Sequence, residues 1–260
     1  MHTEGKVSVE HQGHICLIGL DRAAKRNAFD SHMIQALSEA LTAYEANDDL
    51  RCAIIFAHGD HFTAGLDLVE LQPKLHDGVF HFEPNQVDPW GLMGQRRKKP
   101  VIAAIQGLCY TAGIELMLNA DVVVAADNAQ FTQIEVLRGI MPFGGATVRF
   151  VQAAGWQKAM PYLLTGQVFD AKTALDLNLV SFVCDVSNVM SQAMLWAERI
   201  AQAAPLAVRA LLKSAREGQE SPEQAFANFH QYVQPLFSSE DVQEGVRAML
   251  ERRLPQFQGK

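Results

Sequence analysis

Short apolar runs, of the kind that form buried strands, recur along the first three quarters of the chain. They cover residues 14–20, 52–57, 101–106, 122–125 and 179–183. Between these runs the apolar residues follow helical spacing. Strands that alternate with helices predict an α/β layer structure.

The clearest helical segment follows Asp30 and Ser31. Apolar side chains recur there at helical intervals, so they share one face of the helix. These residues are Met33, Ile34, Leu37, Leu41 and Tyr44. We expect Asp30 or Ser31 to cap the helix, because a short polar side chain can accept a hydrogen bond from a free amide of the first turn.

The pattern changes near Pro205. Beyond this residue the apolar positions keep helical spacing and no strand-like run separates them, as Phe226, Phe229 and Val233 illustrate. We therefore expect an α/β body over residues 1–204 and a helical C-terminal region over residues 205–260. A region of that length buries too little apolar surface to be stable alone, so it should pack on the body or on another subunit.

A segment rich in proline, glycine and aromatic residues lies between Leu71 and Pro100. Proline and glycine interrupt regular structure, whereas Phe80, Phe82 and Trp90 favour burial. The segment is either a loop that covers a site or a packed surface connection, and the sequence favours neither. The basic run at 96–99, near its end, is expected to be a solvated turn.

Composition excludes several classes of protein. The 260 residues are 48% hydrophobic and 20% charged, which is typical of a globular chain and not of a disordered or fibrous one. The net charge of −7 disfavours binding to nucleic acid but leaves a small anionic ligand possible. No apolar run approaches the roughly eighteen residues that span a membrane, so no membrane partner is expected.

Cysteine and histidine usage indicates neither disulfides nor a metal. Cys16, Cys52, Cys109 and Cys184 form no CxxC pair and have apolar neighbours, as expected of buried free thiols in a reducing compartment. The N-terminus lacks the apolar stretch of a signal peptide, so we expect a cytoplasmic protein. The histidines of segment 58–61 have no further ligands at a suitable spacing, and no metal is expected.

Three segments carry candidate chemistry. In residues 107–118, small residues follow an apolar strand and lead into a helix that contains Glu115. In residues 60–68, a second turn of small residues follows a second strand. Such turns expose backbone N–H groups that can bind an oxyanion. Residues 129–145 place Glu135 in apolar surroundings ahead of a glycine-rich turn.

In this order the segments resemble the crotonase superfamily of enoyl-CoA hydratases and isomerases. The stretch Leu-Asp-Arg-Ala-Ala-Lys-Arg-Asn-Ala at 20–28 is similar to the family's N-terminal turn, and residues 251–257 are similar to the end of its C-terminal helix. The resemblance spans nearly the whole chain. It implies a crotonase-like spiral of ββα units that binds acyl-CoA and performs catalysis. It also implies that the helical C-terminal region forms a homotrimer or homohexamer.

The resemblance also assigns roles to individual residues. It implies an oxyanion hole made by the backbone N–H groups of Leu66 and Ala112, with Glu115 activating water and Glu135 protonating the α-carbon. The family's contacts to CoA and substrate match Lys25, Ala28, Ala64, Asp67, Leu68 and Gly113. Capping of a helix is the other interpretation of Asp67.

The implied reaction is syn addition of water to a trans-2-enoyl-CoA, which gives a 3-hydroxyacyl-CoA. CoA is part of the substrate, so no separate cofactor is expected. Glu115 and Glu135 stand 20 positions apart, as in hydratases of the family, and two carboxyl groups in an apolar pocket can divide proton removal from proton delivery. Double-bond isomerisation, another acyl-CoA reaction and non-catalytic acyl-CoA binding stay open as alternatives.

The chain departs from the family pattern in two places. The GGG that precedes the first glutamate is replaced by Thr111, Ala112 and Gly113. An alanine N–H still donates, whereas its methyl group narrows the approach. The family's PGxGG turn begins here with Pro142 and Phe143, and we expect these two residues to shape the water or acyl pocket.

Overall fold

Two β-sheets form the centre of the body. The computed structural model describes residues 4–74 and 80–260. Within them six strands form the larger sheet, in the order β1-β2-β3-β4-β6-β9, and three form the smaller sheet, in the order β5-β7-β8. The strands are β1 (Lys6–Gln12), β2 (Ile15–Asp21), β3 (Cys52–Ala57), β4 (Val101–Ile105), β5 (Leu108–Tyr110), β6 (Val122–Ala126), β7 (Gln130–Thr132), β8 (Phe169–Asp170) and β9 (Phe182–Cys184).

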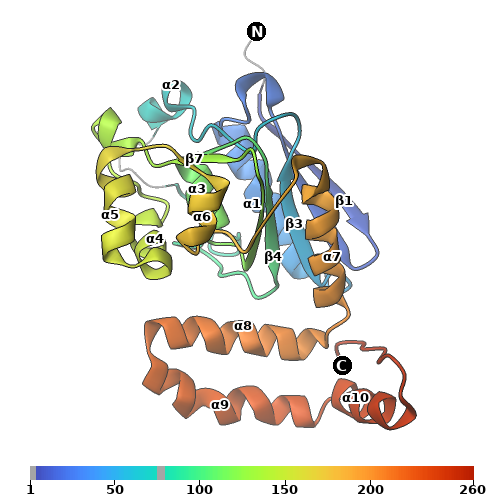
Figure 1. Ribbon diagram of the computed structural model, residues 1–260. Helices are drawn as coiled ribbons and strands as arrows, with labels where there is room; N and C mark the ends of the chain where they lie inside the picture. Colours follow the sequence, from blue (N-terminus) through green and yellow to red (C-terminus); the bar gives the residue numbers. More distant parts are fainter. Residues whose placement is uncertain (1–3, 75–79) are drawn as a thin grey trace.

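Helices surround these sheets and continue into the C-terminal region (Figure 1). The α-helices are α1 (Ser31–Ala46), α2 (Leu68–Leu71), α3 (Ala112–Met117), α4 (Ala146–Ala154), α5 (Trp156–Thr165), α6 (Ala171–Asp176), α7 (Val189–Ala201), α8 (Pro205–Glu220), α9 (Pro222–Phe237) and α10 (Glu240–Glu251). Single 3₁₀ turns are η1 (Ala23–Lys25), η2 (Gln72–Lys74), η3 (Glu135–Arg138) and η4 (Val186–Asn188).

The larger sheet is covered on both faces, which explains its continuous apolar strands. β1 runs antiparallel to β2, and the other neighbours in this sheet are parallel. Successive side chains of a strand point to opposite faces. Accordingly Cys16 and Ile18 pack in the same cluster as residues of α1, whereas Ile15 and Leu17 pack with residues of α7. Buried parallel strands of this kind are typical of α/β proteins.

The helical start at Asp30 is confirmed. The Asp30 side chain accepts a hydrogen bond from the Met33 amide at 2.9 Å, so Asp30 rather than Ser31 is the cap of α1. The predicted strand at 52–57 coincides with β3. The strand predicted at 179–183 is wrong at its start, because Leu179 and Val180 are buried before β9 begins at Phe182.

The basic run at 96–99 is solvated only in part, which corrects the sequence prediction: Arg96 and Lys98 are exposed. Arg97 and Lys99 are buried. The Lys99 ammonium donates to the carbonyl oxygens of Tyr44, Asn47 and Leu50 at the end of α1, where backbone carbonyls lack helical partners. The run therefore ties the start of β4 to the end of α1.

The segment from Leu71 to Pro100 is partly packed into the body. Residues 75–79 lie outside the described residues. Val87 and Trp90 are buried, and Phe80 and Phe82 are partly buried. The Trp90 indole N–H donates to the Ala112 carbonyl at 2.9 Å, so this segment reaches the turn before α3.

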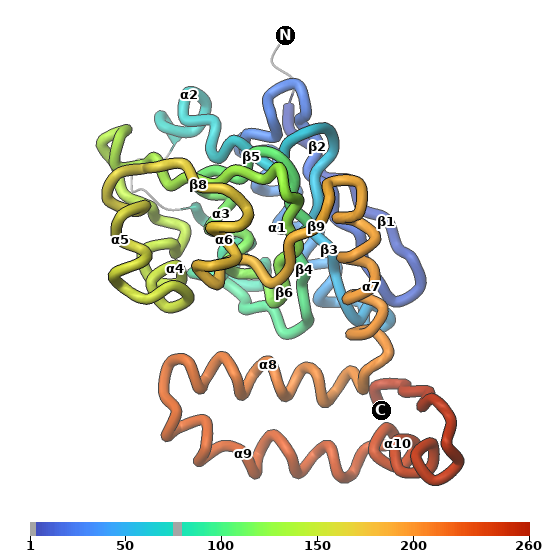
Figure 2. The backbone as a smooth tube through the Cα atoms, in the orientation of Figure 1, coloured from blue at the N-terminus to red at the C-terminus, as the bar shows by residue number. Residues whose placement is uncertain are grey.

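The C-terminal helices lie apart from the sheets. Figures 1 and 2 show α8 and α9 running side by side below the body, with α10 beside them near the C-terminus. Ion pairs link α8 to the body, as between Arg209 and Asp48 at 2.7 Å and between Arg216 and Asp121 at 2.8 Å. The division of roles between residues 1–204 and 205–260 stays a prediction.

Two further features bear on the sequence predictions. All four cysteines are free; Cys16, Cys52 and Cys109 are buried and Cys184 is partly exposed. Among the helices of residues 4–74 and 80–260, none combines the length and apolar character needed to cross a bilayer.

Candidate active site

Backbone hydrogen bonds bring the sequence motifs together at one edge of the body. The Phe29 amide donates to the Gly65 carbonyl at 2.8 Å, which joins the turn at 25–28 to the turn at 64–68. The Tyr110 amide donates to Thr63 at 3.1 Å, and the Thr111 amide donates to Thr132 at 2.9 Å. All four segments therefore meet, including the segment that leads to Glu135.

Two backbone N–H groups remain free to bind a ligand oxygen. Leu66 and Ala112 follow the two small-residue turns, and no acceptor for either amide occurs in the described part of the chain. Leu66 is half-buried and Ala112 is buried. The turns that carry these amides are hydrogen-bonded to each other, and an oxyanion hole formed by the two amides stays a prediction.

Close packing explains why the first turn needs glycine. Gly65 has a φ of +92°, and a Cβ on it would lie 1.8 Å from the Thr111 hydroxyl oxygen. An L-residue at this position would meet both backbone strain and a steric clash. Gly113 is similarly confined, since a Cβ there would lie 2.4 Å from Cγ2 of Thr63. The small residues thus permit the two turns to touch.

Glu115 lies on α3 with its carboxylate buried. Its Oε1 accepts hydrogen bonds from the amides of Gly144, at 2.7 Å, and Ala146, at 3.1 Å. Burial raises the pKa of Glu115 above its ordinary value, although these two donors and the charge of Arg149 favour the ionised form. The glycine-rich turn after Phe143 therefore holds this carboxylate in place.

Glu135 begins the 3₁₀ turn η3 and is also buried. Burial, with a smaller contribution from the charge of Glu115, raises the pKa of Glu135 to about 7. With its nitrogen turned toward the carboxylate, the buried Gln133 amide donates to both Glu135 oxygens, at 2.9 and 3.1 Å. A carboxyl with this pKa can hold or release a proton near neutral pH.

Asp67 stands at the N-cap position of α2, although its side chain forms no capping hydrogen bond. Its carboxylate instead forms an ion pair with the buried Arg22 guanidinium at 2.9 Å. Arg22 also lies 3.3 Å from the Asp30 carboxylate. Burial acts to raise the pKa of Asp67, but the hydrogen bond and charge of Arg22 lower it overall. Arg22 therefore links the turn at 20–28 to the turn at 64–68 through its ion pair with Asp67.

The other predicted substrate-binding residues border the same two turns. Lys25 and Leu68 are exposed, whereas Ala28 and Ala64 are half-buried. The Ala64 amide donates to the Arg26 carbonyl at 2.9 Å, which keeps the Lys25–Ala28 turn beside the Ala64–Leu68 turn. Contact of these residues with CoA stays a prediction.

Aromatic side chains line the region next to the glycine-rich turn. The rings of Phe80 and Trp90 stack with centroids 5.1 Å apart, and the Phe143 ring lies 6.0 Å from that of Phe80. Phe143 is half-buried and Pro142 is buried. Since Gly144 follows Phe143 and binds Glu115, the aromatic group adjoins the carboxylate.

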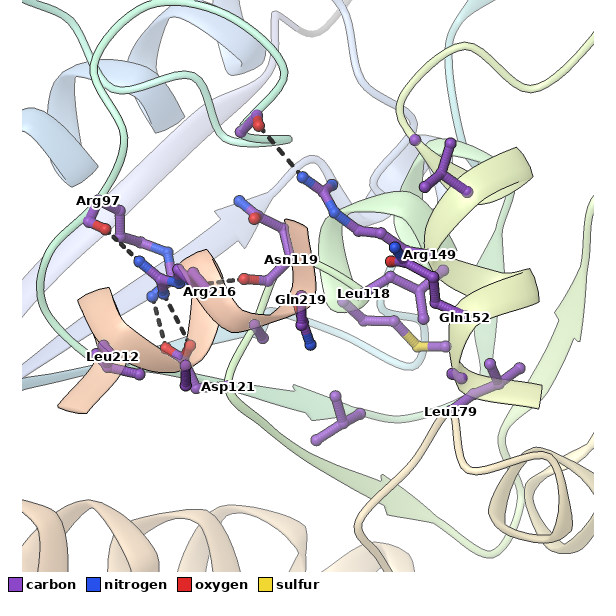
Figure 3. Close-up of a pocket in the computed structure, with 18 of the residues that line it drawn as sticks. Arg97, Leu118, Asn119, Asp121, Arg149, Gln152, Leu179, Leu212, Arg216 and Gln219 are labelled. Atoms are coloured by element: carbon purple, nitrogen blue, oxygen red, sulfur yellow. Dashed lines mark hydrogen bonds and ion pairs between the residues drawn. The ribbon is translucent and has the colours of Figure 1, made fainter. Parts of the chain in front are cut away.

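A large cavity of about 720 Å³ lies elsewhere, between the body and α8 (Figure 3). Its wall includes Arg149, Asn119 and, grouped at one side, Arg97 and Arg216, which both form ion pairs with Asp121. Neither Glu115 nor Glu135 lines it. This cavity is therefore separate from the two carboxylates.

Sequence reasoning did not find several residues that support the site. These are Arg22, Trp90, Gln133, Gly144 and Ala146. The amide donors of Gly144 and Ala146 are main-chain groups and leave no side-chain signal. Gln133 offered a signal, because it is an amide two residues before Glu135 within an apolar stretch.

Comparison with known proteins agrees with this arrangement. The family model for enoyl-CoA hydratase/isomerase matches residues 10–260. The enoyl-CoA hydratase EchA19 of Mycobacterium tuberculosis is 34% identical over 256 residues, which cover 97% of this chain and 96% of that protein. The 2,3-dehydroadipyl-CoA hydratase of Escherichia coli is 34% identical over 253 residues, covering 97% of this chain and 98% of that protein.

Solved structures show the same fold. A probable enoyl-CoA hydratase/isomerase from Mycobacterium abscessus superimposes with a TM-score of 0.94 at 40% identity, covering 98% of this chain and 99% of that one. An enoyl-CoA hydratase from Bacillus anthracis gives a TM-score of 0.90 at 27% identity, covering 98% and 100% of the two chains. The predicted crotonase-like fold is confirmed, and the chain belongs to the enoyl-CoA hydratase/isomerase family.

Proposed function

We propose that this protein is an enoyl-CoA hydratase that adds water to a trans-2-enoyl-CoA and yields a 3-hydroxyacyl-CoA. The observation that carries the proposal is the pair of buried carboxyl groups, Glu115 and Glu135, beside two free backbone amides. Both carboxyl groups have raised pKa values. Hydration needs such a pair, since one group must accept a proton from water and the other must deliver a proton to carbon.

In the proposed mechanism, the amides of Leu66 and Ala112 bind the thioester carbonyl oxygen. They polarise the conjugated double bond and stabilise the enolate that forms at the α-carbon. Glu115, held in place by the Gly144 and Ala146 amides, accepts a proton as water attacks the β-carbon. Glu135, with a pKa of about 7, donates its proton to the α-carbon. Addition of the hydroxyl group and the proton to the same face of the double bond gives the syn product. No cofactor besides the CoA of the substrate takes part.

We further propose that the CoA portion lies along the two joined turns. Lys25 is exposed there and can pair with a CoA phosphate, and Ala28, Ala64 and Leu68 form the adjoining surface, whereas Gly113 is buried. Asp67 also borders this surface, while its carboxylate is already paired with Arg22. We assign Asp67 mainly to holding the turn in place.

The acyl group is proposed to extend along Pro142 and Phe143. The position of Phe143 next to the residue that binds Glu115, and its packing against Phe80, support this direction. An aromatic wall favours apolar acyl groups, because it buries their surface away from water.

The C-terminal helices support a homotrimer or homohexamer. Apolar side chains of α9 and α10 are exposed, including Phe226 at 67%, Phe237 at 73% and Leu250 at 75%. A surface of this kind marks a protein interface. The solution mass from light scattering should be three or six times that of one chain, and a monomer at micromolar concentration would contradict this assignment. The free, mostly buried cysteines are consistent with a cytoplasmic location.

The activity is tested by following the absorbance of the enoyl thioester, with straight-chain substrates from four to ten carbons supplied separately. We expect the absorbance to fall and the 3-hydroxyacyl-CoA to accumulate. A 3-enoyl-CoA is the control for isomerisation and free-thiol release is the control for hydrolysis. If the protein only binds acyl-CoA, or forms either control product faster than the hydrate, the proposed function is wrong.

A further inference from the structure

Thr111 adjoins both donor turns, because it directly precedes Ala112 and its hydroxyl packs on Gly65. Thr111 has φ +51° and ψ −114°, a backbone conformation that β-branched residues rarely adopt. At this ψ the Cβ of an L-residue nearly eclipses the amide nitrogen of the next residue, which here is the Ala112 donor. The threonine side chain therefore lies alongside the direction in which the Ala112 N–H points.

The same side chain also touches the other donor turn. The position that a Cβ on Gly65 would take is 1.8 Å from the Thr111 hydroxyl oxygen, so this oxygen rests directly on Gly65. Leu66, the second donor, follows Gly65. The hydroxyl is thus placed between the two turns whose amides bind the substrate oxygen in the proposed function.

The Thr111 hydroxyl is available for a ligand. The described residues give it no hydrogen-bond partner, in contrast to Thr63, whose hydroxyl donates to the Asn27 carbonyl at 2.6 Å. Thr111 is half-buried. Among the described residues, Nε1 of Trp196 is the one buried side-chain polar atom without a hydrogen-bond partner. The Thr111 hydroxyl oxygen also has no partner but is not among these buried atoms, so it is accessible to solvent.

We propose that the Thr111 hydroxyl is a third hydrogen-bond donor to the thioester oxygen of the substrate. The proposal rests on the oxyanion hole assigned above to Leu66 and Ala112. A hydroxyl donor strengthens as negative charge develops on the acceptor, so Thr111 acts more on the transition state than on the bound substrate. This contact offsets the conformational strain that threonine carries at this position.

Two matched substitutions separate the hydroxyl from the shape of the side chain. Thr111→Val keeps the branched shape and removes the hydroxyl, whereas Thr111→Ser keeps the hydroxyl and removes the methyl group. We expect Thr111→Val to lower kcat for hydration of trans-2-butenoyl-CoA by about tenfold to hundredfold, with KM within about threefold of wild type. Thr111→Ser should retain activity within about threefold. Thr111→Ala serves in place of Thr111→Val if the latter does not fold.

A spectroscopic readout tests the contact without turnover. An aryl enoyl-CoA with a para-amino group absorbs at longer wavelength when its carbonyl oxygen is polarised, so the bound probe reports on hydrogen bonds to that oxygen. The red shift should be smaller in Thr111→Val than in wild type and Thr111→Ser. Equal shifts and equal kcat in all three proteins would overturn the proposal, as would equal losses in both variants. Absence of hydration with an intact, Thr111-dependent red shift would instead reject the hydratase assignment and leave this contact standing.

Discussion

The α/β body and the C-terminal helices bury their apolar residues to very different extents. Ile18, Ile54 and Phe131 of the body have no exposed surface, whereas Phe226 and Phe237 of the tail are 67% and 73% exposed. The body thus contains a buried hydrophobic core, whereas the tail exposes large apolar side chains to solvent. The oligomer proposed above would give the apolar face of the tail a partner surface, whereas the core of the body is buried within the chain itself.

All residues of the proposed reaction lie in the α/β body. Leu66, Ala112, Glu115 and Glu135 all belong to the body, and their positions depend on strand ends and turns joined by backbone hydrogen bonds. Placement on a rigid, buried framework suits groups that must hold their geometry during a reaction. A change in the body should therefore affect catalysis and stability, and a matched change on the tail, outside the exposed apolar side chains of α9 and α10, should affect neither.

The largest contrast is expected for two Glu→Gln substitutions. Glu135→Gln should lower kcat about a thousandfold, because it removes the general acid that protonates the α-carbon. Glu223→Gln, on the exposed start of α9, should leave kcat within about twofold. Steady-state kinetics with trans-2-butenoyl-CoA measures kcat of both variants. Equal kcat values would show that Glu135 is not needed for hydration.

Truncation of buried and exposed apolar side chains gives the next largest difference. Ile54→Ala should lower the free energy of unfolding by about 2–5 kcal/mol, because it leaves a cavity beneath α7. Leu211→Ala, at a side chain that is 64% exposed, should change it by about 0.5 kcal/mol or less. Denaturant unfolding at a fixed protein concentration tests this. A similar loss in both variants would mean that α8 is as well packed as the body.

The buried carboxyl of Glu135 makes the stability of the body depend on pH. Its pKa of about 7 in the folded protein lies above its ordinary value of 4.5, so ionisation in the folded protein costs free energy. The stability that it contributes is present below pH 4.5 and is lost as the pH rises through about 7.

Glu135→Gln should therefore be more stable than wild type above pH 7 by about 3 kcal/mol, with the difference vanishing near pH 4.5. Glu223→Gln is the tail control and should track wild type throughout. Thermal or denaturant unfolding at a series of pH values gives the difference directly. A difference that is constant with pH would contradict the raised pKa.

The smallest effect is expected for the ion pair between Arg209 of α8 and Asp48. The Asp48 side chain is 84% exposed, so water screens the attraction. Arg209→Ala should cost about 1 kcal/mol or less, and high salt should remove that cost. A double-mutant cycle with Asp48→Ala measures the coupling, and a value of several kcal/mol would show that α8 is fastened to the body by charge.

Some elements of the fold could be predicted from sequence because a local pattern determines them. The apolar run of β3 is buried on both faces, and the cap of α1 is a local hydrogen bond. β1 was missed because it is an edge strand whose side chains are mostly exposed, so its residues show no apolar run. The extent of β9 depends on its pairing with β6, which local spacing does not encode.

The charged residues show a similar limit. The sequence pattern treats Arg97 and Lys99 as solvated, but both are buried because they bind carbonyl oxygens and Asp121 from other parts of the chain. Glu115 and Glu135 were identified through resemblance to a family, and their apolar neighbours agreed with burial. Their supporting contacts, from Gly144, Ala146 and Gln133, depend on tertiary structure and could not be read from local sequence.

The central claim is that the body uses Glu115 and Glu135 to add water to an enoyl thioester. The most direct test is mass spectrometry of the product formed from trans-2-butenoyl-CoA in water enriched in heavy oxygen. We expect one heavy oxygen on the β-carbon of a 3-hydroxyacyl-CoA with wild type, and strongly reduced incorporation with Glu115→Gln or Glu135→Gln. Release of free CoA, formation of an unlabelled isomer, or equal incorporation by the three proteins would contradict it.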